Sequence, residues 1–140
     1  MTTARDLMTK GPVTVSPRTT VRQAARLLYT LDVRHLPVVD EEGTLVGMLS
    51  DRDLRGVALP LDVDGEHVAD RRAALDAPVA TLMSGDVISV DLEDDAAVVV
   101  ELMIDHRIGA IPVVDADGAV VGIVSYVDVL RELPLDAEAG

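Results

Sequence analysis

LPVVDEEGTLVGMLSDRDL occupies residues 36–54, and its pattern is the strongest indication of the fold of this chain. It begins with an apolar run of strand length, which a polar turn containing Gly43 separates from a second apolar run. Glycine can adopt the positive φ that such turns often need. Ser50 and Asp53 then have the spacing of a helix start. The stretch therefore predicts a β-hairpin that runs directly into a helix.

The same pattern occurs a second time, as IPVVDADGAVVGIVSYVDV over residues 111–129. Identical residues recur at a constant offset of 75 positions, without a gap. The matching pairs include Pro37 and Pro112, Val38 and Val113, Val39 and Val114, Asp40 and Asp115, Gly43 and Gly118, Gly47 and Gly122, Ser50 and Ser125, and Asp53 and Asp128. The chain is therefore expected to contain an internal duplication.

Each copy has a predicted strand and helix before its hairpin. The strands are expected at residues 13–15 and 87–90. Thr20 and Gln23 form a potential capping box for the first helix, and Asp94 or Asp95 can cap the second. The expected apolar faces consist of Val21, Ala24, Ala25, Leu28 and Leu31 in the first helix, and Ala96, Val99, Val100 and Met103 in the second. Each copy thus reads strand, helix, strand, strand, helix.

The remaining segments have weaker patterns. Residues 4–8 predict one helical turn, and Gly56 is expected to end the helix that follows the first hairpin. Residues 58–78 have no counterpart in the duplication and are interpreted as a connector, with a loop near 62–65 and a short helix over 66–75. Residues 132–140 are expected to form a mobile tail.

Composition narrows the possible functions. The 140 residues are 49% hydrophobic and include no cysteine, which excludes a disulfide framework and thiolate chemistry. The two halves are expected to share a core, because each would bury too little surface alone. The net charge of −13 argues against nucleic-acid binding. No signal peptide or membrane span is apparent, so we expect a cytoplasmic protein with no membrane partner.

Several segments together resemble a tandem pair of cystathionine-β-synthase (CBS) domains, known as a Bateman module. They are the Leu-Met before each first strand, the Val-Thr-Val strand, LPVVD…G…LVGMLSDRD and IPVVD…G…VVGIVSYVD, and the resemblance covers about residues 4–132. It implies an α+β fold of two βαββα units packed with pseudo-two-fold symmetry. The implied domains are residues 4–60 and 79–133, with a connector over 61–78. The opening MTTARDLM is also similar to stand-alone actinobacterial CBS-pair proteins, some of which are linked to stress responses.

The resemblance further implies a regulatory module that binds adenine nucleotides (AMP, ADP or ATP) or a related adenosyl ligand in the cleft between the units. It implies no cofactor, although Mg²⁺ could accompany a polyphosphate in so acidic a chain. It also implies a homodimer that acts on an unknown effector protein. The ligand-binding residues that it implies are Thr14, Arg34, His35, Pro37, Ser50, Arg52, Asp53, Ser89, Ala110, Pro112, Ser125 and Asp128.

The Ser-x-x-Asp spacing has two physical interpretations. Free N–H groups at a helix start favour phosphate, and a nearby carboxylate can accept hydrogen bonds from both hydroxyls of a ribose. The same spacing also forms a capping box that needs no ligand. His35 is similarly open to two interpretations, as a phosphate-contacting residue or as an exposed turn histidine.

The two Ser-Asp motifs differ in the charge around them. Arg34, His35 and Arg52 surround the first motif, and their counterparts at the second are Gly109, Ala110 and Val127. Arg107 offers partial compensation where the first copy has Asp32. We therefore expect the first motif to bind a charged nucleotide more tightly, and the second to prefer AMP or adenosine, or to stay empty.

Three functional hypotheses follow. The first is a ligand-sensing module, and the second is a structural interaction module whose ligand sites are vestigial. The third is an enzyme that uses acidic residues with a metal. The sequence offers no set of nucleophile, base and orienting residue, which argues against the third hypothesis.

Overall fold

The computed structural model describes residues 2–58 and 68–132. These residues form two compact units. The first-repeat unit contains residues 13–58 and 68–87, and the second-repeat unit contains residues 2–12 and 88–132. Both units combine helices with strands, which confirms the predicted α+β class. None of the helices within this part of the chain is both long and apolar enough to cross a membrane.

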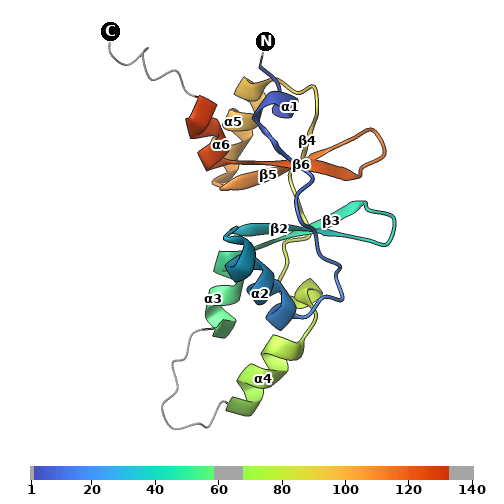
Figure 1. The fold of residues 1–140 in the computed structure, drawn as a ribbon, viewed down its shortest axis with the longest axis vertical. Coiled ribbons are helices and arrows are strands. Elements are labelled where there is room, and N and C mark those ends of the chain that lie inside the picture. Colours follow the sequence, from blue (N-terminus) through green and yellow to red (C-terminus); the bar gives the residue numbers. More distant parts are fainter. Residues whose placement is uncertain (1, 59–67, 133–140) are drawn as a thin grey trace. The chain divides into compact units, whose positions relative to one another are not determined.

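The second-repeat unit is built on a four-stranded sheet in the order β1-β6-β5-β4. β4 pairs with β5 in parallel, and the other neighbours are antiparallel. Helices α5 and α6 lie on one face of this sheet (Figure 1). The elements are α1 (Ala4–Leu7), β1 (Thr9–Lys10), β4 (Val90–Asp91), α5 (Ala96–His106), β5 (Ala110–Val114), β6 (Val120–Ser125) and α6 (Tyr126–Glu132). The predicted strand–helix–strand–strand–helix order is confirmed here.

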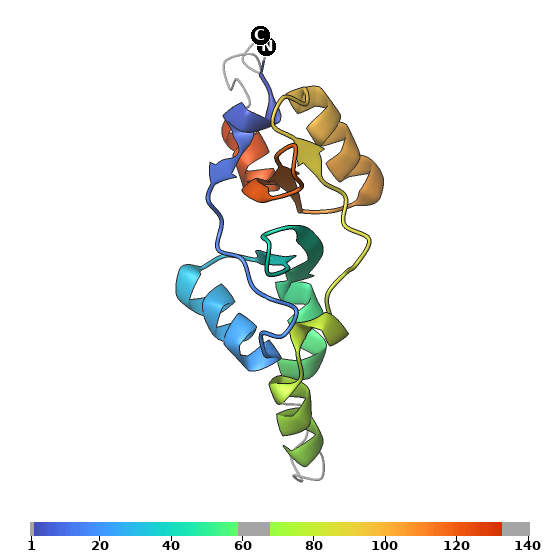
Figure 2. The same cartoon turned by 90° about the vertical axis from the view of Figure 1, so that its right-hand side faces the viewer.

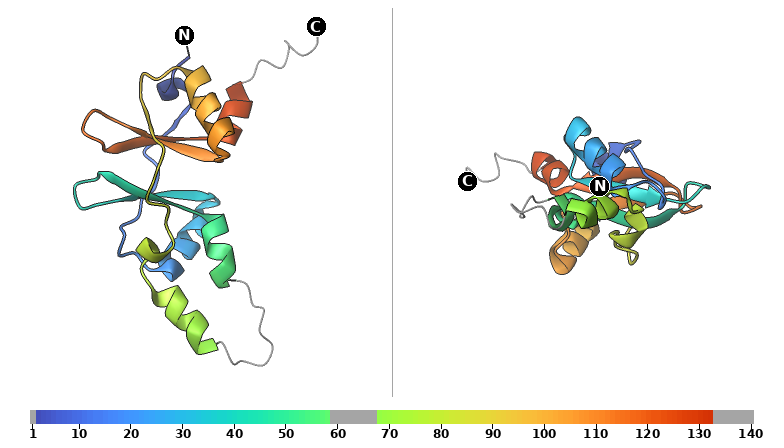
Figure 3. Two further views of the ribbon diagram at one scale, coloured as in Figure 1. Left: turned by 180° about the vertical axis from the view of Figure 1, so that it is seen from behind. Right: turned by 90° about the horizontal axis from the view of Figure 1, so that it is seen from below.

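The first-repeat unit has the same plan with fewer strand pairings. Its hairpin is antiparallel, and α4 lies against α2 and α3 (Figure 2). The short helix η1 lies near the start of α2 (Figure 3, left), where the Val79 amide donates to the Thr19 carbonyl at 2.7 Å. The elements are α2 (Val21–Leu31), β2 (His35–Val39), β3 (Leu45–Ser50), α3 (Asp51–Ala58), α4 (Val68–Asp76) and η1 (Val79–Thr81).

The outer strands of the first-repeat unit are reduced to single bridges. Val15 bridges Val38 in parallel, and Ser84 bridges Met48 in antiparallel fashion. These bridges take the places of β4 and β1 in the other unit. The predicted strand over residues 13–15 is therefore wrong except at Val15, and the prediction over 87–90 is met only at Val90, where β4 begins. Prolines 12 and 17 flank the first segment and have no N–H to extend a ladder.

The opening segment of each repeat packs into the unit of the other repeat. Ala4 and Leu7 are buried in the core of the second-repeat unit, with Val99 and Ile111. Val79 is correspondingly buried in the first-repeat core, and Leu82 and Met83 pack against that core. The packing units thus differ from the repeats as they run along the sequence.

The predicted helix starts are confirmed. The Thr20 hydroxyl accepts from the Gln23 amide at 3.1 Å, and the Gln23 side chain accepts from the Thr20 amide at 3.0 Å. Asp95 caps α5 by accepting from the Ala97 amide at 3.0 Å. These bonds satisfy helix amides that would otherwise lack partners.

Two details of the predicted helices are wrong. Leu31 is 41% exposed, because it lies at the end of α2, where the next residue adopts a left-handed conformation. Gly56 does not end α3, which continues to Ala58. α4 begins at Val68 and ends at Asp76, close to the helix predicted over 66–75. The predicted loop near 62–65 and the tail after residue 132 lie outside the described residues.

Candidate functional site

Both Ser-Asp motifs lie where the last strand of a hairpin meets a helix. At the first Ser-Asp site, defined by Ser50 and Asp53, the Ser50 amide donates to Asp53 Oδ2 at 2.9 Å, and the Asp53 amide donates to Ser50 Oγ at 3.4 Å. At the second Ser-Asp site, defined by Ser125 and Asp128, the corresponding distances are 2.9 and 3.3 Å. Both motifs therefore form the predicted capping box.

The residues that precede Pro37 in β2 and Pro112 in β5 lie beside the Ser-Asp sites. His35 is the register partner of Ser50, and Ala110 is the partner of Ser125. The Asp51 amide donates to the Arg34 carbonyl at 2.9 Å, which fixes the start of α3 against the start of β2. The structure thus brings together residues that the sequence separates by about one hairpin.

His35 is half-buried at this junction. Its burial lowers the pKa of the imidazole below the ordinary value of 6.5, because desolvation disfavours the charged form. Asp51 and Asp53 oppose this shift, and Arg34 and Arg52 add to it. His35 is therefore predominantly neutral at pH 7, and a bound anion would favour its protonation.

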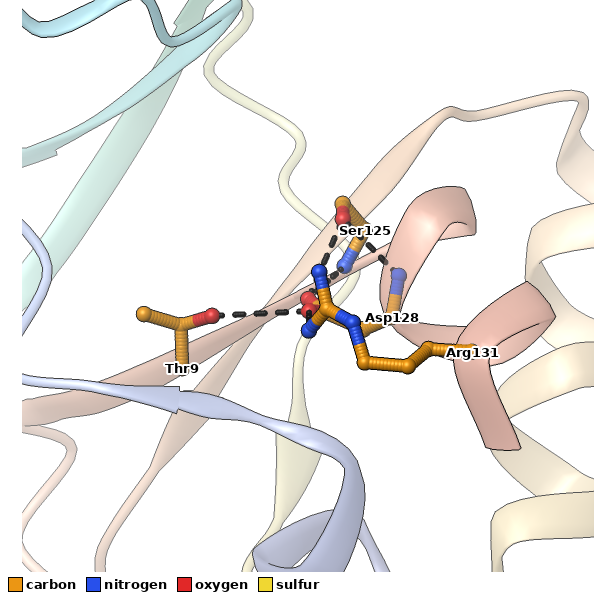
Figure 4. A network of polar contacts seen from close by, with 4 residues as sticks. All are labelled: Thr9, Ser125, Asp128 and Arg131. Atoms are coloured by element: carbon orange, nitrogen blue, oxygen red, sulfur yellow. Dashed lines mark hydrogen bonds and ion pairs between the residues drawn. The ribbon is translucent and has the colours of Figure 1, made fainter.

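Asp128 is a buried carboxylate with a full set of partners (Figure 4). Its Oδ2 accepts from the amide of Ser125 at 2.9 Å and from the hydroxyl of Ser125 at 3.1 Å. Its Oδ1 accepts from Nη1 of Arg131 at 3.2 Å and lies 3.5 Å from the hydroxyl of Thr9. β1, β6 and α6 together surround this one carboxylate.

Sequence reasoning missed both Thr9 and Arg131. Arg131 follows Asp128 by three residues on a helix, a spacing that places two side chains on one face and could have revealed the pair. Thr9 is 119 residues from Asp128, so no local pattern points to it. The offset of 75 places Ser84 and Gly56 at the corresponding positions of the first-repeat unit. The first site therefore has no counterpart of the Arg131 guanidinium.

The other predicted ligand residues occupy different environments. Pro37 and Pro112 are fully buried inside β2 and β5. Thr14 and Ser89 immediately precede Val15 and Val90, whose partners Val38 and Val113 lie on those same strands. Thr14 and Ser89 therefore lie on the opposite side of β2 and β5 from the Ser-Asp sites.

The remaining predicted ligand residues differ in exposure. Arg34 and Arg52 are exposed and make no ion pair with another described residue, and Ala110 is buried.

Within the described ranges, no group of three or more His, Cys, Asp or Glu residues is arranged to hold a metal ion. The acidic hairpin turns have a structural use instead. Oδ1 of Asp40 accepts from the amides of Glu42 and Thr44, both at 2.9 Å. Asp115 makes the equivalent pair of bonds in the second hairpin.

Comparison with known proteins identifies the family. The sequence matches the CBS domain over residues 4–60 and again over 79–135. It is 35% identical to the CBS domain-containing protein YhcV of Bacillus subtilis, over the whole chain and 91% of that protein. Other curated relatives are enzymes, a homoserine O-acetyltransferase and an inosine-5′-monophosphate dehydrogenase, but the chain spans only 22% and 23% of their lengths.

Solved structures give the same result. CBSX2, solved in complex with AMP, superposes with a TM-score of 0.79 at 31% identity, covering 94% of this chain and 95% of that one. The CBS domain pair of protein MJ0100, in complex with 5′-methylthioadenosine and S-adenosyl-L-methionine, has a TM-score of 0.76 at 28% identity, covering 100% and 99% of the two chains. The chain therefore belongs to the CBS domain family and contains a tandem pair of CBS domains.

Proposed function

We propose that this protein is a non-catalytic regulatory module that binds adenine nucleotides or related adenosyl ligands at its two Ser-Asp sites. The observation that carries the proposal is the repeated placement of a carboxylate at a strand–helix junction, in a fold whose relatives were solved with AMP, S-adenosyl-L-methionine and 5′-methylthioadenosine. The proposed ligand residues are those that the family resemblance implies, with Ser50, Asp53, Ser125 and Asp128 at their centre.

The groups at the first site support nucleotide binding there. Among the hydrogen bonds between described residues, the Asp53 carboxylate accepts only that of the Ser50 amide, so it retains acceptor positions for the two hydroxyls of a ribose. Arg34, His35 and Arg52 supply positive charge or N–H donors next to it, in a chain of net charge −13. We therefore expect the first site to bind the more highly charged nucleotide. Mg²⁺ could offset further phosphate charge.

We also propose that two copies of the chain associate through the second-repeat unit. On α5, Ile104 is 68% exposed. It lines a groove of about 420 Å³ between α1, α5 and α6, together with Val100 and Val129. In the first-repeat unit, α4 lies against the equivalent helices α2 and α3. The uncovered apolar face therefore favours the second-repeat unit as the place where two copies meet.

A structural interaction module is the second candidate function. The reciprocal bonds within each Ser-Asp site satisfy the helix start without any ligand. In that case both sites would be caps alone, and the protein would act only through its contacts with a partner protein. The contact with that partner protein would then not depend on a ligand.

Thermal unfolding separates the two candidates. Melting temperature is measured with and without AMP, ADP, ATP, NAD and S-adenosylmethionine, at several concentrations of each. A ligand at 100 times its Kd should stabilise the folded state by about 2.7 kcal/mol. A concentration-dependent rise with at least one adenosyl ligand supports the sensing module. The absence of any rise with all five ligands would favour the interaction module.

A further inference from the structure

The two Ser-Asp sites differ in how far the carboxylate is already occupied. A carboxylate has two oxygens and about four acceptor positions. At Asp128, Ser125 provides two hydrogen bonds to Oδ2, while Arg131 and the more distant Thr9 approach Oδ1. Asp53 has none of these side-chain partners among the described residues. A ribose that binds Asp128 must therefore displace an existing partner.

Arg131 is the partner that can move. Its side chain is 67% exposed, whereas the side chain of Asp128 is only 7% exposed. Thr9 belongs to a strand and Ser125 ends one, so their positions are set by the sheet. Arg131 instead reaches Asp128 through a long side chain on the outer part of α6 (Figure 4). Displacing it breaks one ion pair and leaves the fold of the unit intact.

We propose that Arg131 selects the charge of the ligand at the second Ser-Asp site, an inference that rests on the proposed function. A neutral nucleoside that takes Oδ1 of Asp128 leaves the guanidinium without an anionic partner. A nucleotide brings a phosphate with which the released guanidinium can form a charge-assisted pair. Arg131 thereby disfavours adenosine and favours AMP. It provides one positive charge at a site that lacks counterparts of Arg34, His35 and Arg52.

The expected effects follow from the strength of a partly exposed ion pair. Such pairs contribute about 0.2–1 kcal/mol, which corresponds to a change in affinity of up to about fivefold. The Arg131→Ala variant should therefore bind adenosine up to about five times more tightly. Its affinity for AMP should change much less, because it loses both the ion pair that AMP displaces and the phosphate pair that replaces it, so the preference for AMP over adenosine should fall by up to about fivefold. Arg131→Lys keeps the charge and should retain the preference.

The test is titration calorimetry with AMP and adenosine in an Asp53→Ala background, which isolates the second site. Arg55→Ala is the matched control, because Arg55 is 68% exposed and pairs with Asp51 at 3.6 Å on the equivalent helix α3. An unchanged preference in Arg131→Ala would overturn the inference, as would an equal shift for both ligands or the same shift in Arg55→Ala.

Two further outcomes separate this inference from the proposed function. If the Asp53→Ala protein binds neither ligand while the wild type does, the second site is not a binding site. The inference then fails, and the proposed function holds for the first site alone. If the wild type binds neither ligand nor any other adenosyl compound, both the inference and the proposed function fail.

Discussion

Met83 lies directly against the backbone of Gly47. A Cβ placed on Gly47 would be 2.5 Å from the Met83 sulfur and 3.1 Å from the carbonyl oxygen of Ser84. Gly122 and Met8 repeat this relationship in the second-repeat unit. In each hairpin, a side chain larger than glycine would press on the opening segment of the other repeat at this position. This packing gives a physical reason for Gly47 and Gly122, which the sequence shows only as matching positions of the two hairpins.

Replacing Gly47 with alanine should destabilise the protein by about 1–3 kcal/mol, because the added methyl group overpacks the contact with Met83. The free energy of unfolding from urea denaturation measures this change. Gly85→Ala is the control, since a Cβ there meets no atom within 4 Å. Met83→Ala should cost less in the Gly47→Ala protein than in the wild type. Additive effects would show that the two residues do not press on each other.

Asp53→Ala and Asp128→Ala should lower both stability and ligand affinity. Loss of a helix cap costs about 0.5–2 kcal/mol, and loss of a charge-assisted contact to ribose costs about 1.5–3 kcal/mol of binding free energy. Asp115→Ala is a matched control, because Asp115 also accepts two backbone amides, at 2.9 and 3.0 Å, but belongs to a hairpin turn. It should lower stability and leave affinity unchanged. Equal affinities in all three variants would identify the Ser-Asp motifs as caps alone.

The lowered pKa of His35 predicts a contribution to pH-dependent stability. Because the folded protein disfavours protonated His35, the unfolded chain binds more protons between the folded pKa and 6.5. The stability from this group is fully present above about pH 6.5 and decreases as the pH falls through the folded pKa. Urea unfolding at several pH values between 7.5 and 5 should show a smaller loss of stability in His35→Gln. His106→Gln is the control, because His106 is exposed. Parallel pH profiles for wild type and His35→Gln would contradict the assignment.

The proposed dimer predicts a mass near twice 14.9 kDa in light scattering at micromolar concentration. Ile104→Glu should convert it to a monomer, because a charge would be buried in the apolar contact. Tyr29→Glu is the control at the equivalent position of the first repeat, where the side chain is 90% exposed. It should leave the mass unchanged. A wild-type monomer, or a dimer that persists in Ile104→Glu, would rule out this interface.

The local parts of the fold could be predicted from the sequence. The hairpins and helix starts depend on residues within a few positions of each other, so the apolar runs, Thr20 with Gln23, and the Ser-Asp spacings were sufficient. The exchange of opening segments could not be predicted, because it depends on contacts between distant residues such as Ala4 and Ile111.

The candidate sites show the same division. The duplication identified Ser50, Asp53, Ser125 and Asp128, and the structure confirms that each pair is hydrogen-bonded. Thr9 approaches Asp128 because β1 pairs with β6, and no local sequence pattern predicts that pairing. The single bridge at Val15 likewise depends on residues distant in sequence. The Val15 amide donates to the Pro37 carbonyl, and the Val39 amide donates to the Val15 carbonyl.

Titration calorimetry on the wild type and on the Asp53→Ala/Asp128→Ala double variant tests whether adenosyl ligands bind at the Ser-Asp sites. AMP, ADP and S-adenosylmethionine are titrated into each protein, after circular dichroism has shown that the double variant remains folded. We expect saturable binding of at least one of these ligands to the wild type and a loss of that binding in the double variant. Binding of equal affinity and stoichiometry in both proteins would contradict the assignment of the Ser-Asp sites, and the absence of binding to the wild type would contradict the proposed function.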